Sequence, residues 1–178
     1  MTKFSDEMTT ILFKEIQKFR QVWLWLLIVF IDSMIFYGLY QQFVLQKPFG
    51  DNPMSNEGLI ITAVLILCFT AFFMIMQLRT SITEKGIELQ FFPIHHHKKT
   101  YSWHEISEVY IREYKALREY GGWGIRTGAY NVSGNKGLQL IFKNGEKLLI
   151  GTNQPDELEN VILSLKQKQI IASKVSDE

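Results

Sequence analysis

The sequence predicts a membrane protein in which a two-helix transmembrane hairpin precedes a cytoplasmic domain. That domain is expected to be a bent antiparallel β-sheet, or split barrel, of about seven strands capped by a C-terminal α-helix. Three features predict this fold class: two long hydrophobic runs, a following series of short segments with period-two alternation, and one amphipathic helical stripe near the end. A chain of 178 residues has room for one hairpin and one domain of ordinary size.

The first 21 residues are expected to form an amphipathic lead-in on the cytoplasmic side. Ser5 suits a helix N-cap, and Asp6 and Glu7 would follow it near the positive end of the helix dipole. Apolar residues then recur at helical spacing from Ile11 to Phe19, beside charged residues. Such a helix would lie in the membrane interface ahead of the first span.

Residues 22–78 are predicted to form the hairpin, with spans at 22–45 and 58–78 and an extracytoplasmic loop at 46–57. The second run has 21 residues without a charge. At the helical rise per residue it covers about 31 Å, which matches the hydrocarbon core of a bilayer. A buried core helix would usually be shorter and carry a polar stripe. The first span follows a charged tail and precedes no small-residue cleavage site, so it does not resemble a signal peptide.

The orientation of the hairpin follows from its flanking charges. Basic residues lie just outside the two spans (Lys14, Lys18, Arg20, Arg79 and Lys85), whereas the connecting loop contains only Lys47. The positive-inside rule therefore places both termini in the cytoplasm, in a protein that crosses the cytoplasmic membrane twice. Cys68, the single cysteine, lies within the second span, so no disulfide is expected.

Asp32 lies near the middle of the first span, where an acid opposes insertion by about 2.5 to 3.5 kcal/mol. The surrounding Leu, Ile, Phe and Val residues each favour insertion by about 0.3 to 0.6 kcal/mol, so the span is expected to persist. In an antiparallel hairpin Thr70 reaches a similar depth and can donate a hydrogen bond to Asp32. We interpret this pair as a helix-packing or self-association feature, with a proton or ion site as the alternative.

Residues 79–168 have the pattern of a complete domain and are expected to fold without the hairpin. Two hairpin turns are predicted, at Glu84–Gly86 and Lys143–Gly145, each between alternating segments. The last element begins near Pro155, has acids in its first turn and lysines in its last, and is therefore a helix. Its apolar stripe contains Leu158, Val161, Ile162 and Leu165, and residues 169–178 are expected to be a tail.

This order of strands and helix suggests the pleckstrin-homology (PH) fold, in which a helix plugs the open end of a small bent sheet. Four segments strengthen the suggestion: "EKGIELQFFP", "YSWHEISEVYIREY", "YGGWGIR" and "LLIGTNQPDELENVI". They resemble successive blocks of a bacterial PH-like domain family that is found behind paired membrane helices. The resemblance covers residues 79–168 and implies a binding domain without an established catalytic activity.

The glycine-rich stretch from Tyr120 to Gly137 does not match a nucleotide-binding loop. Gly128 and Gly134 are one residue too far apart for the P-loop pattern GxxxxGK, and Lys136 is not followed by Ser or Thr. Gly122, Gly124 and Gly128 give GxGxxxG, which is one residue longer than the dinucleotide-binding pattern GxGxxG. We therefore predict an architectural role for the glycines, as turns for the first pair and as bends within a strand for the second (Gly121, Gly122, Gly124 and Gly128).

Four residues are candidates for contact with a ligand or partner: Trp123, Arg126, Lys98 and Lys99. Trp123 is equally compatible with a core position. The histidines from His95 to His97, with His104, are too poorly supported by carboxylates or cysteines to predict a metal site, and no cofactor is expected. Instead, this basic segment is suited to anionic lipid headgroups, where each Lys contributes about 1 kcal/mol.

The expected function is that of a non-enzymatic, membrane-anchored binding module at the cytoplasmic membrane face, with a protein or an anionic lipid as its partner. The alternative is a small accessory subunit of a transporter or membrane sensor complex, which would recognise its partners through the hairpin. The expected partners are the lipid bilayer and a membrane protein, which could be a second copy of the chain. The chain has 14 basic and 12 acidic residues from Arg79 to its end, too small an excess for nucleic-acid binding.

Overall fold

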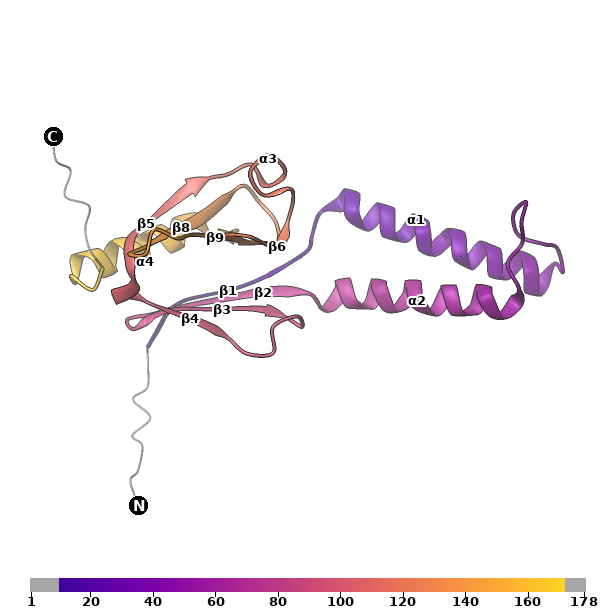
Figure 1. Cartoon of the computed structure of the whole chain (residues 1–178), viewed down its shortest axis with the longest axis horizontal. Coiled ribbons are helices and arrows are strands. Elements are labelled where there is room, and N and C mark those ends of the chain that lie inside the picture. The colour runs from indigo at the N-terminus through magenta and orange to yellow at the C-terminus, as the bar shows by residue number, and fades with distance from the viewer. Residues whose placement is uncertain (1–9, 172–178) are drawn as a thin grey trace, which may run out of the picture. The chain divides into compact units, whose positions relative to one another are not determined.

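The computed structural model describes residues 10–171 and divides the chain into two compact units (Figure 1). The first unit is a helical hairpin from Phe19 to Met76. The second is a sheet domain, whose described parts are residues 10–18 and 77–171. The hairpin is therefore an insertion in the sequence of the sheet domain.

The hairpin contains two helices that are long and apolar enough to cross a membrane. Helix α1 (Val22–Leu39) continues into a π-helical turn, η1 (Tyr40–Val44), and α2 (Asn56–Ile75) begins after the N-cap Ser55. Only 17% of the most apolar window of each helix is buried, which differs from the burial of a core helix in a soluble protein. The second span was predicted to reach Leu78, but the helix ends at Ile75 because the next residues belong to a strand.

The sheet domain contains two sheets. The first is antiparallel, in the order β1-β2-β3-β4: β1 (Ile11–Lys18), β2 (Gln77–Thr83), β3 (Gly86–Phe92) and β4 (Lys99–Ser102). The second has the order β5-β8-β9-β7-β6: β5 (Ile106–Glu113), β6 (Gly124–Arg126), β7 (Ala129–Asn131), β8 (Lys136–Phe142) and β9 (Lys147–Thr152). In this sheet only β7 and β9 run parallel. Residues 10–171 thus contain nine strands, two more than predicted.

The additional strand β1 corrects the prediction of a helical lead-in. Phe13, Glu15 and Gln17 are buried whereas Lys14 and Ile16 are exposed, which is the period-two pattern of a strand with one covered face. The apolar spacing of this segment suggested a helix. Spacing alone does not reveal that β2, almost sixty residues later, supplies a pairing partner. The proposed cap at Ser5 lies outside the described residues.

The core of the domain lies between the first sheet, the second sheet and helix α4 (Pro155–Gln167). The completely buried side chains come from all three (among them Leu78, Ile82, Ile87, Leu89, Phe91, Leu138, Leu140, Leu149 and Leu165). The predicted helix is confirmed, with Leu158, Ile162 and Leu165 buried and Val161 partly buried. Ile171 is also buried, so the ordered domain continues beyond the predicted boundary at residue 168, and residues 172–178 lie outside the described part.

Two short helices were not predicted. The 3₁₀-helix η2 (Trp103–Glu105) starts at Ser102 with a capping box, and buried Trp103 donates from Nε1 to the carbonyl oxygen of Thr83 at 2.9 Å. Helix α3 (Ala116–Tyr120) ends at Gly121, which has the left-handed conformation. Both helices are shorter than two turns, so hydrophobic periodicity does not reveal them.

Strand β1 is attached to the end of β9 through buried polar groups. The Glu15 carboxylate accepts hydrogen bonds from Thr152 Oγ1 at 2.7 Å and from the Asn153 backbone N–H at 2.8 Å. Gln17 Nε2 donates to the Gly151 carbonyl oxygen at 2.6 Å. These contacts connect residues more than 130 positions apart, so the segment before α1 is an integral part of the domain.

Burial raises the pKa of the Glu15 carboxyl above 4.5, and the hydrogen bonds from Thr152 and Asn153 oppose this only in part. The folded state therefore binds a proton more readily than the unfolded state. We expect the Glu15 contribution to the free energy of unfolding to be greatest below pH 4.5 and to be lost as the pH rises through the raised pKa. Denaturant titrations of the detergent-solubilised protein between about pH 4 and pH 8 measure this. Glu15→Gln is expected to flatten that part of the profile, and an unchanged profile would contradict the assignment.

Candidate functional site

The sheet domain has an open groove of about 940 Å³ between its two sheets. Strand β4 and η2 form one wall, and the β6–β7 and β8–β9 turns form the other, with β7 and β9 behind them. Since β4 is the last strand of the first sheet, one of its edges has no neighbouring strand within the described residues. The groove therefore follows an open sheet edge.

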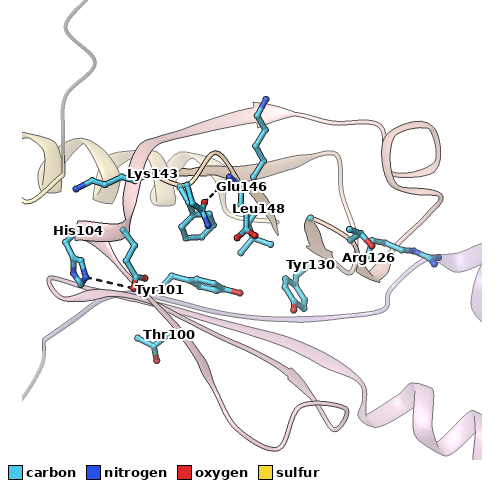
Figure 2. A pocket seen from close by; sticks show the side chains of 14 residues that line it. Thr100, Tyr101, His104, Arg126, Tyr130, Lys143, Glu146 and Leu148 are labelled. Atoms are coloured by element: carbon cyan, nitrogen blue, oxygen red, sulfur yellow. Dashed lines mark hydrogen bonds and ion pairs between the residues drawn. The ribbon is translucent and has the colours of Figure 1, made fainter.

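The interior of the groove is aromatic. Tyr101 on β4 packs against Phe142 at the end of β8, with ring centroids 5.5 Å apart. Figure 2 shows the Tyr101 and Tyr130 rings within the space between the sheets, with Leu148 beside them. Aromatic side chains bury a large area at low conformational cost and carry a polar handle in tyrosine, which suits a contact surface.

Lys99 and Tyr130 form a polar pair beside these rings. Lys99 Nζ donates to the Tyr130 hydroxyl at 2.7 Å and lies 5.3 Å from the centre of the same ring. The hydrogen bond to Tyr130 raises the pKa of Lys99, so its ammonium is charged at neutral pH. Burial, with the nearby Tyr130, raises the pKa of Tyr101, so its phenol is neutral and can donate a hydrogen bond.

Charged residues surround the groove rather than fill it. Arg126, Lys143 and Lys147 are exposed on the rim, with Glu105 and Glu146 as the acids. Figure 2 shows the Arg126 and Lys143 side chains directed away from the cavity. The groove therefore has an apolar floor and a mixed, slightly basic rim.

The four predicted contact residues are not all at one site. Arg126 lines the groove, and Lys99 contacts it through Tyr130. Lys98 instead forms an ion pair with Glu88 at 2.7 Å. Trp123 is partly buried against a small apolar cluster and lines a different hollow, of about 510 Å³, near α3. The sequence reasoning missed Tyr101, Tyr130, Phe142 and Leu148, which four different strands bring together.

The four predicted structural glycines all have positive φ angles: Gly121 (70°), Gly122 (126°), Gly124 (118°) and Gly128 (78°). Gly121 and Gly122 follow α3, as a turn requires. The prediction that Gly124 and Gly128 bend a single strand is corrected, because Arg126 pairs with Ala129 and encloses a two-residue turn, Thr127–Gly128. Gly128 therefore shapes the groove wall by closing the β6–β7 hairpin.

Gly128→Val is expected to destabilise the domain by roughly 1 to 3 kcal/mol, the cost of forcing a residue with a Cβ into a left-handed conformation. A Cβ at this position would also approach the Lys147 carbonyl oxygen to 3.3 Å. Thr127→Val is the matched control, because Thr127 has no positive φ angle. Denaturant unfolding of the two variants measures the difference, and equal stabilities would contradict the turn assignment.

The structure also places the histidines and the Asp32–Thr70 pair. Within residues 10–171 no group of three or more His, Cys, Asp or Glu side chains is placed to hold a metal ion. His95 instead lies edge-on to Tyr130, with centroids 5.7 Å apart, and His104 Nδ1 lies 2.5 Å from Ser102 Oγ. In the hairpin, Thr70 Oγ1 donates to the Asp32 carboxylate oxygens at 3.1 and 3.2 Å, so the expected hydrogen bond is present.

No family model matches this chain, and a search of curated proteins finds no match either.

Proposed function

We propose that this chain is a non-enzymatic binding module that the α1–α2 hairpin anchors in the cytoplasmic membrane. In this proposal both termini and the sheet domain lie on the cytoplasmic side, and the domain is of the PH-like type suggested by its sequence blocks. Two packed sheets and a C-terminal helix support that architecture.

The observation that carries the proposal is the position of the hairpin in the sequence of the domain. It is inserted between β1 and β2, whose ends Lys18 and Gln77 are direct partners across the sheet. Both connections to the hairpin therefore leave the domain from adjacent strands. Two such connections restrict the domain to the membrane surface more strongly than one flexible linker, and so raise its effective concentration for membrane-bound partners.

The aromatic groove is the surface that we assign to the partner. Its open β4 edge and apolar floor suit an extended protein segment, which can add to a sheet edge through backbone hydrogen bonds. The alternative, recognition through the hairpin by a transporter or sensor complex, would use the intramembrane acid. Asp32 already has a hydrogen-bond partner in Thr70, which favours a packing role for the pair.

The membrane topology is tested with single cysteines in a Cys68→Ala background. Asn52 in the loop between the helices and Asn160 on α4 are both exposed and suit substitution by cysteine. With intact cells, an impermeant thiol reagent is expected to label position 52 and to label position 160 only after the cells are permeabilised. The reverse pattern would overturn the proposed orientation.

The binding role is tested with a photo-crosslinking residue at Thr100, beside the groove, and with the same residue at Asn160 as a control. We expect position 100 to give a defined adduct that Tyr101→Ala abolishes, with no adduct from position 160. Adducts that are equal at both positions, or that Tyr101→Ala leaves unchanged, would favour the accessory-subunit alternative. Loss of the protein in Tyr101→Ala is monitored by its abundance and melting temperature.

A further inference from the structure

We infer that the outer face of the first sheet docks on an anionic phospholipid surface through a basic–apolar patch made of Lys14, Ile16, Lys18, Arg79 and Phe92. The inference rests on the proposed membrane anchoring and adds a second, direct contact between the sheet domain and the bilayer. It concerns a different surface from the aromatic groove.

The strand register places the five residues of the patch on one face. In β1, the patch residues Lys14, Ile16 and Lys18 alternate with the inward-facing Phe13, Glu15 and Gln17. Residues that pair directly across neighbouring strands lie on the same face of a sheet. Ile16 on β1 pairs with Arg79 on β2, and β2 in turn pairs with β3. By the same register Lys18 pairs with Gln77, and Gln77 pairs with Phe92.

Within residues 10–171, no other part of the sheet domain covers this face. Figure 1 shows the second sheet and α4 on one side of β1–β4, so the patch is on the other side. Ile16 is 52% exposed, although it belongs to a sheet whose opposite face is almost completely buried. An isolated exposed isoleucine is ordinary, but Ile16 pairs with Arg79, whose guanidinium lies over the Phe92 ring.

The patch has a strong positive charge. Lys14, Lys18 and Arg79 contribute three positive charges, and the Arg79 guanidinium lies 4.8 Å from the centre of the Phe92 ring. In the described strands of this sheet, Glu88 is the one acid on the outer face, and the ion pair with Lys98 neutralises it. Cations beside apolar side chains match a surface of lipid phosphates above hydrocarbon.

The patch is also close to the points at which the chain enters the hairpin. Lys18 is the last residue of β1 and Gln77 the first of β2, and neighbouring strands are about 4.8 Å apart. Phe92 on β3 pairs with Gln77. The loop after Phe92 contains Ile94, which is 47% exposed. Gln90 Nε2 holds this loop through the carbonyl oxygens of His95 and His96 at 3.1 and 3.2 Å.

Spans α1 and α2 would therefore hold this edge within a few residues of the lipid headgroups. A membrane-anchored domain with a basic, partly apolar face at its attachment point gains electrostatic attraction from the anionic cytoplasmic leaflet. A protein partner would need a surface of equal negative charge at the same depth. The bilayer supplies that charge without a further component, and we therefore commit to lipid.

The test uses the full-length protein in nanodiscs, with one fluorophore-labelled cysteine in a Cys68→Ala background. Positions 16 (Ile16→Cys) and 160 (Asn160→Cys) report on the patch and on the control surface of α4. Headgroup-attached nitroxide lipid is the quencher, in phosphatidylcholine discs with and without about one-third phosphatidylglycerol. Leu65→Cys, which is on the exposed surface of α2, reports insertion of the hairpin through quenching by chain-attached nitroxide.

We expect strong quenching at position 16 in the anionic discs, weaker quenching in neutral discs, and little at position 160 in either. Lys14→Gln with Arg79→Gln is expected to reduce the docking equilibrium about fivefold per charge. The control Lys115→Gln with Arg118→Gln removes the same charge from exposed positions in the α3 region and is expected to have no effect.

Equal quenching at positions 16 and 160, or no dependence on phosphatidylglycerol, would overturn the inference. Quenching at position 65 separates this failure from that of the anchor. If position 65 is quenched and position 16 is not, the hairpin is inserted and only the docking patch is wrong. If position 16 is quenched in anionic discs and position 65 is not, the patch is correct and the anchoring proposal fails. If neither is quenched, both fail.

Discussion

A variant in which Asn-Gly replaces residues 19–76 is expected to be a soluble protein with one cooperative unfolding transition. Lys18 and Gln77 are directly paired, so the two inserted residues would form a two-residue hairpin loop between β1 and β2. Asn-Gly favours the type I′ turn, which matches the twist of the flanking strands. The variant keeps every strand of the described sheet domain and removes both apolar helices.

Residues 77–171 alone are expected to aggregate or to remain unfolded, although the sequence pattern suggested that 79–168 is a complete domain. Without β1, the inward-facing side of β2 loses Phe13, and the end of β9 loses its buried contacts with Glu15 and Gln17. β2 also becomes an unprotected sheet edge. We expect the loss of β1 to remove most of the free energy of unfolding, which is typically about 5 to 15 kcal/mol.

Solubility, circular dichroism and thermal melting of the two proteins measure this difference under identical conditions. Equal melting temperatures would mean that β1 is dispensable and that the domain boundary predicted from the sequence is correct. Failure of both proteins to fold, across several turn sequences, would mean that the domain needs the hairpin for its stability.

Phe13→Ala is expected to destabilise the sheet domain by about 3 to 5 kcal/mol, because it leaves a cavity where a buried aromatic ring was. Phe13 is 2% exposed on the inner face of β1. Ile16→Ala, three residues later, is the matched control and is expected to change the free energy of unfolding by less than about 0.5 kcal/mol. Ile16 lies on the opposite, exposed face of the same strand.

Denaturant titrations followed by tryptophan fluorescence measure both variants, and buried Trp103 makes the signal sensitive to the domain core. An amphipathic helix would give a different result, because Ile16 belongs to the apolar stripe that the helical spacing predicted. Equal costs at the two positions, or a larger cost at Ile16, would therefore contradict the strand assignment.

The candidate site was partly accessible from the sequence. Lys99 and Arg126 were identified as contact residues, and both are at the groove or adjoin it. Lys98 and Trp123 were grouped with them because of proximity in sequence, but Lys98 pairs with Glu88 and Trp123 packs near α3. Spacing along the chain does not reveal which strand faces which, so the aromatic floor of the groove could not be found.

The sequence by itself determined the local features of this protein: two apolar helices, alternating strands, turn glycines and a C-terminal amphipathic helix. Each depends on residues close in the chain, where hydrophobic periodicity and backbone preferences act directly. Only the tertiary structure decided that residues 11–18 form a strand, that two sheets enclose an aromatic groove, and that the hairpin is inserted between paired strands. Those features depend on pairing between segments separated by tens of residues, and long-range burial overrides the local preference of an ambiguous segment such as Ile11–Lys18.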